Sequence, residues 1–224
     1  MSKPIAIAID GPAGAGKSTI ARRLAERLGF VYIDTGAMYR AVALWALRTG
    51  VALSDMHRLE RLAIEAAIEF VPGGGTVLLN GENVTDAIRT PEVSEAASQV
   101  SAVAAVRRAL VAKQREIGEQ VSVVMEGRDI GSVVFPDAKV KIFLDAHPEQ
   151  RVARRALEAS LPPEVVSRQI DERDRRDRTR AESPLVQAPD AVYVDTTGMT
   201  LDQVEEAALR IVRERTSNGK ERTH

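Results

Sequence analysis

The residues Gly11-Pro12-Ala13-Gly14-Ala15-Gly16-Lys17-Ser18-Thr19 fit the pattern G-x-x-x-x-G-K-[ST] of a phosphate-binding loop with no position missing. An apolar run over 5–9 precedes the loop and predicts a buried strand, and apolar residues at helical spacing follow it over 18–28. The glycines allow successive backbone N–H groups to point at one phosphate at the positive end of the new helix. All nine residues are therefore predicted to bind a nucleoside triphosphate, with Lys17 reaching its β and γ phosphates and the Ser18 hydroxyl ligating Mg²⁺. The alternative is an ordinary glycine-rich turn with a solvated lysine.

The composition excludes several other classes of protein. The 31 Lys and Arg residues are nearly cancelled by 32 Asp and Glu, and this net charge of −1 argues against a general nucleic-acid binder. There are no cysteines, so disulfides and thiolate metal sites are excluded, and the three histidines are scattered. No export signal and no apolar span long enough to cross a membrane is visible, so we expect a cytoplasmic protein without a membrane partner. No long apolar stretch requires association, and a monomer is expected.

Strands and helices alternate on both sides of the loop. The pattern predicts an α/β fold in which five parallel strands form a doubly wound sheet, with Asp34 and Thr35 beside the phosphate loop at its carboxyl edge. The expected strands cover 5–9, 30–34, 121–125, 139–144 and 191–195, and the expected helices of this core cover 18–28, 37–49, 103–118 and 201–213.

The stretch 54–101 interrupts this order and predicts an inserted lobe. A helical run is expected over 54–69, and short antiparallel strands over 70–71, 76–79 and 84–85, followed by a helix over 92–99. Pro72-Gly73-Gly74-Gly75 and the hairpin signal Asn80-Gly81 would join the strands. The core domain would then comprise 1–53, 102–150 and 181–214.

The segment 151–180 carries nine arginines, no lysine and six acids. Leu161-Pro162-Pro163 divides it into two predicted helices. Arg173, Asp177 and Arg180 share one stripe of the second helix with Arg176 nearby, and Arg151 and Arg155 share a face of the first. Arginine in preference to lysine favours bidentate capture of phosphate oxygens, although a network of ion pairs within the helices is the alternative. Arg168, Arg175 and Arg178 are expected to be solvated.

A phosphate loop leaves the reaction open, and three classes can be compared. A GTPase would need Asn-Lys-x-Asp, but Asn83-Val84-Thr85-Asp86 lacks the lysine. A motor ATPase would need paired acids after a strand, and Glu126-Gly127-Arg128-Asp129 fits that pattern poorly. A small-molecule kinase needs an acceptor pocket and mobile positive charge, which the inserted lobe and the arginine-rich helices could supply.

Five segments together are specific enough to indicate a family. The segments are the phosphate loop, Asp34-Thr35-Gly36-Ala37-Met38-Tyr39-Arg40, Ala97-Ser98-Gln99-Val100, the segment 126–138 beginning Glu126-Gly127-Arg128-Asp129-Ile130-Gly131, and Glu172-Arg173-Asp174-Arg175-Arg176-Asp177-Arg178-Thr179-Arg180. On these segments the chain resembles the bacterial cytidylate kinases from residue 4 to about 213, and the resemblance implies a P-loop nucleoside-monophosphate-kinase fold with a helical lid.

The resemblance implies transfer of the ATP γ-phosphoryl group to CMP or dCMP. It implies that Asp129, Arg107 and Ser98 read cytosine. It likewise implies that Thr35, Arg40, Arg128 and Arg180 surround the α-phosphate beside Tyr39, and that Arg173 and Asp177 hold the pentose. The inserted lobe would bind the monophosphate, and 151–168 would form the lid. Catalysis would then rest on Mg²⁺ and on charge supplied by Lys17, Arg128, Arg151, Arg155 and Arg180.

Some simpler interpretations remain open at this point. Arg128 and Asp129 could form a structural ion pair, and Thr35 or Asp34 could serve as a helix cap. The lid is short and carries Pro162-Pro163, so residues within it receive no roles from the resemblance. A kinase acting on UMP or a small alcohol, or a module that uses ATP only as a switch, would also fit the motif.

Overall fold

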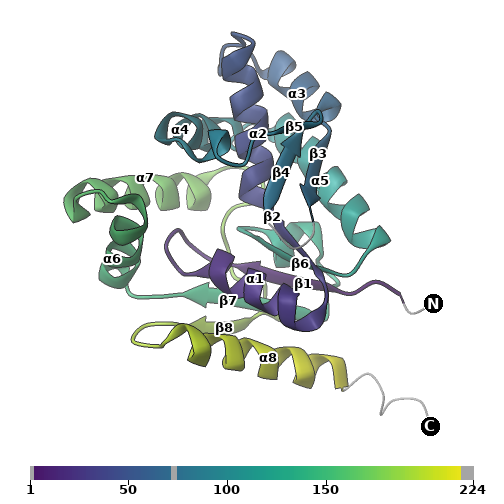
Figure 1. The fold of residues 1–224 in the computed structure, drawn as a ribbon, viewed down its shortest axis with the longest axis vertical. Coiled ribbons are helices and arrows are strands. Elements are labelled where there is room, and N and C mark those ends of the chain that lie inside the picture. The colour runs from purple at the N-terminus through teal and green to yellow at the C-terminus, as the bar shows by residue number, and fades with distance from the viewer. Residues whose placement is uncertain (1–2, 72–74, 218–224) are drawn as a thin grey trace.

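The computed structural model describes residues 3–71 and 75–217, and its centre is a five-stranded parallel sheet (Figure 1). The strands follow the order β2-β6-β1-β7-β8, and every neighbouring pair is parallel. Their bounds are β1 Ala6–Asp10, β2 Val31–Asp34, β6 Val123–Gly127, β7 Val140–Asp145 and β8 Val192–Asp195. The predicted number and orientation of the core strands are confirmed.

Alternate residues of the central strands face opposite sides, so both faces of the sheet need apolar cover. Ile7 and Ile9 of β1 pack against α1 (Lys17–Leu28) and α8 (Leu201–Ser217). Ala8, between them, packs on the other side with Met125 and with Val111 of α5 (Ala104–Gln120). Helices cover both faces, which confirms the doubly wound arrangement.

The predicted small antiparallel sheet is present, but several boundaries predicted in this stretch were wrong, and the strand predicted over 70–71 begins at Ile68. The helical run predicted to reach residue 69 ends as α3 (Met56–Glu65), and β3 (Ile68–Val71) pairs antiparallel with β4 (Thr76–Leu79). The third strand is β5 (Glu82–Asn83) and not 84–85. Asn80 and Gly81 both have positive φ, as in a two-residue hairpin turn, and such a turn sets Leu79 directly opposite Glu82. Residues 72–74 of the predicted connecting loop lie outside the described residues.

The inserted stretch shares a core with α2 (Thr35–Arg48), the helix that follows β2. Figure 1 shows α2, α3 and α4 (Pro91–Val100) grouped with β3, β4 and β5 at one end of the molecule. A short 3₁₀ turn, η1 (Ala87–Arg89), leads into α4. The division of the chain into a core and an inserted lobe stays a prediction.

The arginine-rich segment forms two helices that meet at an angle beside the sheet (Figure 1). They are α6 (Pro148–Ala159) and α7 (Pro163–Thr179), and the prolines at 162–163 separate them as predicted. Ser160 takes a left-handed conformation and closes α6. A single π-helical turn, η2 (Ile130–Val134), follows β6 and was not predicted.

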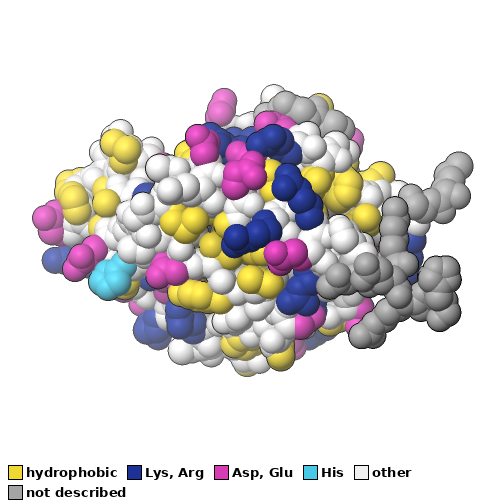
Figure 2. Space-filling view, turned by 90° about the horizontal axis from the view of Figure 1, so that it is seen from below, with side chains coloured by type: hydrophobic (Ala, Val, Ile, Leu, Met, Phe, Trp, Pro, Cys, Tyr) yellow, Lys and Arg dark blue, Asp and Glu magenta, His cyan; other side chains and the backbone are white. Residues whose placement is uncertain are grey.

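The described residues give two further findings about the outer surface. Within residues 3–71 and 75–217, no helix is both long and apolar enough to cross a bilayer. Figure 2 shows one face of the molecule, on which acidic and basic side chains are interspersed.

Candidate active site

The predicted phosphate-binding loop connects β1 to α1. Gly16 is the left-handed N-cap of α1, and no side chain of the described residues caps this end, so the first N–H groups of the helix remain available to an anion. Gly14 has φ 76°, and a Cβ there would lie 2.7 Å from the carbonyl oxygen of Arg151. Only glycine therefore fits at the point where α6 passes the loop. The loop has the open amide end and the tight backbone that a phosphate cradle requires.

Lys17 is buried in the first turn of α1, with 6% of its surface exposed. Its Nζ donates to the carbonyl oxygen of Pro12 at 2.7 Å. Burial and the positive charge of Arg128 lower the pKa of Lys17 from 10.5 to about 7, although Glu126 acts in the opposite direction. Ser18 beside it is exposed. A polyanion at the loop would restore the full charge of Lys17.

The two predicted lid arginines lie in different surroundings. Arg151 is 7% exposed and donates through Nη1 to the carbonyl oxygen of Ala13 at 2.9 Å and to Asp174 Oδ2 at 2.5 Å. Asp174 of α7 also accepts from the Ala13 N–H at 3.2 Å, so α6 and α7 both hold the loop. Arg155 is half exposed and pairs with Glu158 on its own helix at 3.1 Å. The structure brings Arg151 to the phosphate loop and leaves Arg155 at the surface of α6.

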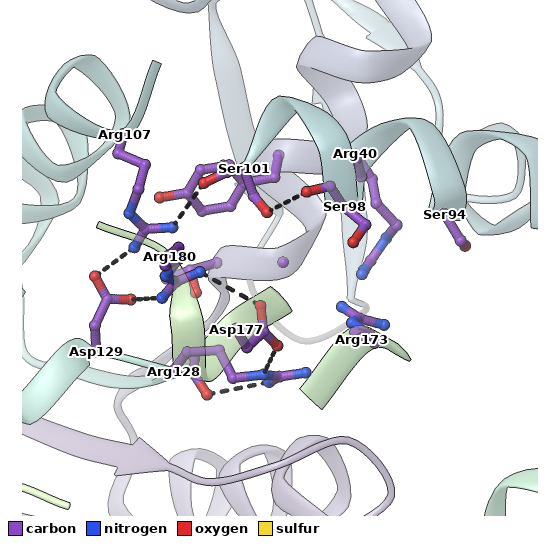
Figure 3. A pocket seen from close by; sticks show the side chains of 15 residues that line it. Arg40, Ser94, Ser98, Ser101, Arg107, Arg128, Asp129, Arg173, Asp177 and Arg180 are labelled. Carbon is purple, nitrogen blue, oxygen red and sulfur yellow. Dashed lines mark hydrogen bonds and ion pairs between the residues drawn. The ribbon is translucent and has the colours of Figure 1, made fainter. Parts of the chain in front are cut away.

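All ten residues predicted to contact the acceptor line a single pocket (Figure 3). The pocket lies between α2, α4, α5 and α7, and the segment after β6 closes its inner end. The predicted residues are Thr35, Tyr39, Arg40, Ser98, Arg107, Arg128, Asp129, Arg173, Asp177 and Arg180. Five further lining residues were not predicted: Gly36, Ser94, Ala97, Ser101 and Gly127.

A buried ion pair stands at one side of this pocket. Arg107 Nη2 donates to Asp129 Oδ2 at 2.5 Å, and their side chains are only 3% and 7% exposed. The ring of Tyr39 lies 5.3 Å from the Arg107 guanidinium, within cation–π range. Arg180 Nη2 approaches the second Asp129 oxygen at 3.6 Å. The Arg107–Asp129 pair therefore places a carboxylate acceptor beside a guanidinium donor, and the packing around both side chains restricts their rotamers.

A second group of charges surrounds Asp177. Its carboxylate accepts from Arg128 Nε at 2.8 Å and from Arg180 Nη1 at 3.4 Å. Burial by itself would raise the pKa of Asp177, but the arginines Arg128, Arg173 and Arg180 outweigh it and hold this pKa below its usual value. Arg128 thus pairs with Asp177 and not with its neighbour Asp129, which removes the simpler interpretation of those two residues as a structural pair.

The pocket carries more positive charge than its own acids neutralise. Five arginines and two aspartates line it, and Asp34, which binds Arg40 at 2.7 Å, adds a third acid, which leaves a formal charge of +2. The Arg173 side chain has no hydrogen bond or ion pair with any described residue, and burial together with the charge of Arg128 lowers its pKa to about 10. Within the described chain, Arg40 Nε, Arg107 Nε and Arg180 Nη2 are buried without a hydrogen-bond partner. Buried donors of this kind indicate an anion site.

Thr35 and Asp34, either of which could have been a helix cap, have different contacts at the carboxyl edge of the sheet. Asp34 is the N-cap of α2 and accepts from the Ala37 N–H at 3.0 Å. Thr35 is the first helical residue, and its hydroxyl donates to the carbonyl oxygen of Glu126 at 2.7 Å. Asp34 therefore has the capping role, while Thr35 joins α2 to the end of β6 beside the pocket.

Sequence reasoning missed two buried acids. Glu126 at the end of β6 accepts from the Tyr32 hydroxyl at 2.6 Å, and burial and the nearby Asp34 raise its pKa, opposed by Lys17 and Ser18. The position of Glu126 at the carboxyl end of a predicted core strand could have identified it as a candidate site residue from the sequence. Asp10 at the end of β1 accepts from the N–H groups of Ile130 and Gly131 at 2.8 and 2.7 Å, and no local pattern marks such a contact.

The acids near the loop do not form a metal cage of their own. Among the described residues, no group of three or more His, Asp or Glu side chains is arranged to hold a metal ion. The Ser18 hydroxyl at the start of α1 is exposed and lies close to the carboxylate of Glu126.

Residues 7–214 of the chain match a family model described as cytidylate kinase. The cytidylate kinase of Solibacter usitatus is 63% identical over 98% of this chain and 97% of its own length. That of Syntrophotalea carbinolica is 51% identical over 96% and 94%. The structural match with a solved gluconokinase from Sinorhizobium meliloti covers 100% of each chain, with a TM-score of 0.55 and 15% identity, so the two proteins share the fold.

Proposed function

The chain belongs to the cytidylate kinase family, and from this premise we propose that it transfers the γ-phosphoryl group of ATP to CMP or dCMP, giving CDP or dCDP. Such an enzyme is a phosphotransferase with a phosphate group as acceptor. The observation that carries the proposal is the arginine-lined pocket with a formal charge of +2, together with a phosphate-binding loop at which no side chain of the described residues caps α1. A nucleoside monophosphate brings two negative charges on its phosphate, which this excess would neutralise.

The Arg107–Asp129 pair supports cytosine as the base. Cytosine carries an amino donor at N4 next to acceptors at N3 and O2. Asp129 offers a carboxylate acceptor for the amino group and Arg107 a donor for the ring acceptors, while Ser98 adds a hydroxyl on the α4 side. Uracil carries an oxygen in place of the amino group, so its O4 would face a carboxylate. The pair therefore favours CMP over UMP.

The remaining arginines are assigned to the acceptor phosphate and the pentose. Arg40, Arg128 and Arg180 bind the phosphate oxygens together with the Thr35 hydroxyl, and Tyr39 packs against the Arg107 end of the site. Arg173 and Asp177 hold the pentose, an arrangement that accepts both the ribose and the deoxyribose. A small alcohol as acceptor is disfavoured, because it would leave this positive charge unneutralised.

No protein nucleophile is needed, because the acceptor phosphate is already anionic at neutral pH. The chain contributes position and charge: Lys17 binds the triphosphate, and Arg128 and Arg180 stabilise the negative charge shared by donor and acceptor oxygens. Arg151 holds the phosphate loop through the carbonyl oxygen of Ala13. Closure of α6 brings Arg155 over the transferring phosphoryl group and excludes water from it.

A magnesium ion fits the residues at the start of α1. The exposed Ser18 hydroxyl would ligate it, and the nearby carboxylate of Glu126 would accept from water molecules around it. When bound, Mg²⁺ neutralises charge on the β and γ phosphates. The other ligands would come from phosphate oxygens and water.

A panel of nucleotides in a coupled assay of ADP release tests the proposal. CMP and dCMP should be the preferred acceptors with ATP, and UMP should be poor. A protein that used ATP only as a switch would instead hydrolyse it slowly, at a rate that no monophosphate accelerates. Gel filtration on the same sample tests the expected monomer.

A further inference from the structure

The acceptor pocket has two walls on separate elements of the chain. Helix α4 contributes Ser94, Ala97 and Ser98, and helix α7 contributes Arg173 and Asp177. Figure 3 shows Ser98 and Arg173 on these two walls, facing the space between them. Whatever fixes the distance between α4 and α7 therefore fixes the shape of the pocket.

One side chain outside the pocket lining joins these walls. Arg176 of α7 donates through Nη1 to Glu95 Oε1 at 2.8 Å and to Ser98 Oγ at 3.1 Å, both on α4. Its Nε donates to Glu172 Oε1 at 2.7 Å, one turn earlier on α7. In residues 3–71 and 75–217, no other hydrogen bond or ion pair joins α4 to α7.

We propose that Arg176 is a positioning residue for the acceptor nucleotide, which holds the Ser98 hydroxyl in place and ties α4 to α7 across the pocket. The proposal rests on the proposed function, because it assumes that Ser98 contacts the acceptor base. Arg176 is not among the residues that line the acceptor pocket. It acts through the hydroxyl that it binds and through the helix on which that hydroxyl stands.

The geometry of the contact explains why an arginine is needed. The planar guanidinium reaches Glu172 with Nε while Nη1 is shared by Glu95 and Ser98, so one rigid group is held at three points. A lysine has a single flexible ammonium group and could not span both helices in the same way. The neighbour Arg175 provides a matched comparison, because its side chain is exposed and, among the described residues, pairs only with Glu172 on its own helix.

The ion pair with Glu95 is partly open to solvent, with side chains 30% and 58% exposed for Arg176 and Glu95. Screening by salt should weaken it, whereas the deeply buried pair Arg107–Asp129 should respond little. Loss of Arg176 would leave Ser98 free to change rotamer and the walls free to separate. Binding of the acceptor should suffer, while the donor loop on the other side of the site is not directly touched.

The test compares Arg176→Ala with Arg175→Ala, using CMP and ATP titrations of the full chain. Arg176→Ala should raise KM for CMP about three- to tenfold, with KM for ATP and kcat within twofold of the wild type. Arg175→Ala should leave all three unchanged. Arg176→Lys should fail to restore KM for CMP. In a Ser98→Ala background, removal of Arg176 should have a clearly smaller effect, because the hydroxyl through which it acts is absent.

Glu95→Gln provides a second variant that keeps the size of the side chain, and it should raise KM for CMP in the same direction if Arg176→Ala does not fold. The inference is overturned if Arg176→Ala and Glu95→Gln behave like Arg175→Ala, if KM for ATP rises as much as KM for CMP, or if the effect is undiminished without the Ser98 hydroxyl. Failure of the proposed function is a different result: the wild-type protein itself would then not phosphorylate CMP.

Discussion

Replacement of Asp129 by asparagine should separate recognition of the base from binding of the donor. Asparagine has nearly the same shape as aspartate and keeps one acceptor oxygen, but it lacks the charge. Asp129→Ala would be a poorer choice, because it would leave Arg107 buried at 2% exposure with its ion-pair partner removed. Breaking a buried ion pair from one side costs about 3–5 kcal/mol, so that variant could lose activity by unfolding.

The size of the effect follows from the contact that is lost. A hydrogen bond to a charged group contributes about 1.5–3 kcal/mol, and each 1.4 kcal/mol corresponds to about a factor of ten. If Asp129 accepts from the cytosine amino group, kcat/KM for CMP in Asp129→Asn should fall roughly 10- to 150-fold. KM for ATP should stay within about twofold, because Asp129 lies in the acceptor pocket.

The preference between bases should change as well. The amide that Asp129→Asn introduces could donate to the O4 oxygen of uracil, which a carboxylate repels, so the ratio of UMP to CMP activity should rise. The assay is coupled ADP release with CMP, dCMP and UMP, and thermal unfolding of the variant serves as the control for folding. A folded Asp129→Asn enzyme with unchanged kcat/KM for CMP would refute the assignment of Asp129 to the base.

Three further predictions concern the donor side and stability. Lys17→Ala should lower kcat on the order of 10²–10³-fold while the unfolding temperature stays close to that of wild type; near-normal turnover would remove Lys17 from the mechanism. Gly14→Ala should raise KM for ATP, because the new Cβ would lie 2.7 Å from the carbonyl oxygen of Arg151. Gly50→Ala is the control for backbone strain alone, because Gly50 also has a positive φ of +66° but no atom lies within 4 Å of its Cβ position. Burial raises the pKa of Asp10 from 3.8 to about 6, so its contribution to stability is full below pH 3.8 and is lost as the pH rises through 6. Of the roughly 3 kcal/mol that this shift represents, about 2 kcal/mol is lost between pH 4.5 and pH 7.5, and Asp10→Asn should lack this loss in denaturant titrations at those two pH values. An identical pH dependence in both proteins would show that Asp10 does not titrate in this range.

The sequence determined the features that depend on neighbouring residues in the chain. The glycine-rich loop, the apolar core strands and the proline break at 162–163 are local patterns, and the structure contains all of them. Helical spacing had already grouped Arg173, Asp177 and Arg180, but the ten acceptor residues received their roles through a resemblance to a family, and they line one pocket. The helix predicted over 54–69 was wrong near its end, because pairing of β3 with β4 outweighed the helical pattern.

Only the tertiary structure decided which charges neutralise one another. Asp10 binds the Ile130 and Gly131 amides about 120 residues further along, Arg128 pairs with Asp177 and not with the adjacent Asp129, and Arg176 crosses from α7 to α4. Such contacts depend on the strand order β2-β6-β1-β7-β8 and on the packing of separate helices, and no periodicity within one segment encodes them. The physical reason is that a buried charge takes whichever partner the fold brings within hydrogen-bonding distance, and distance in space is set by the packing of the whole chain.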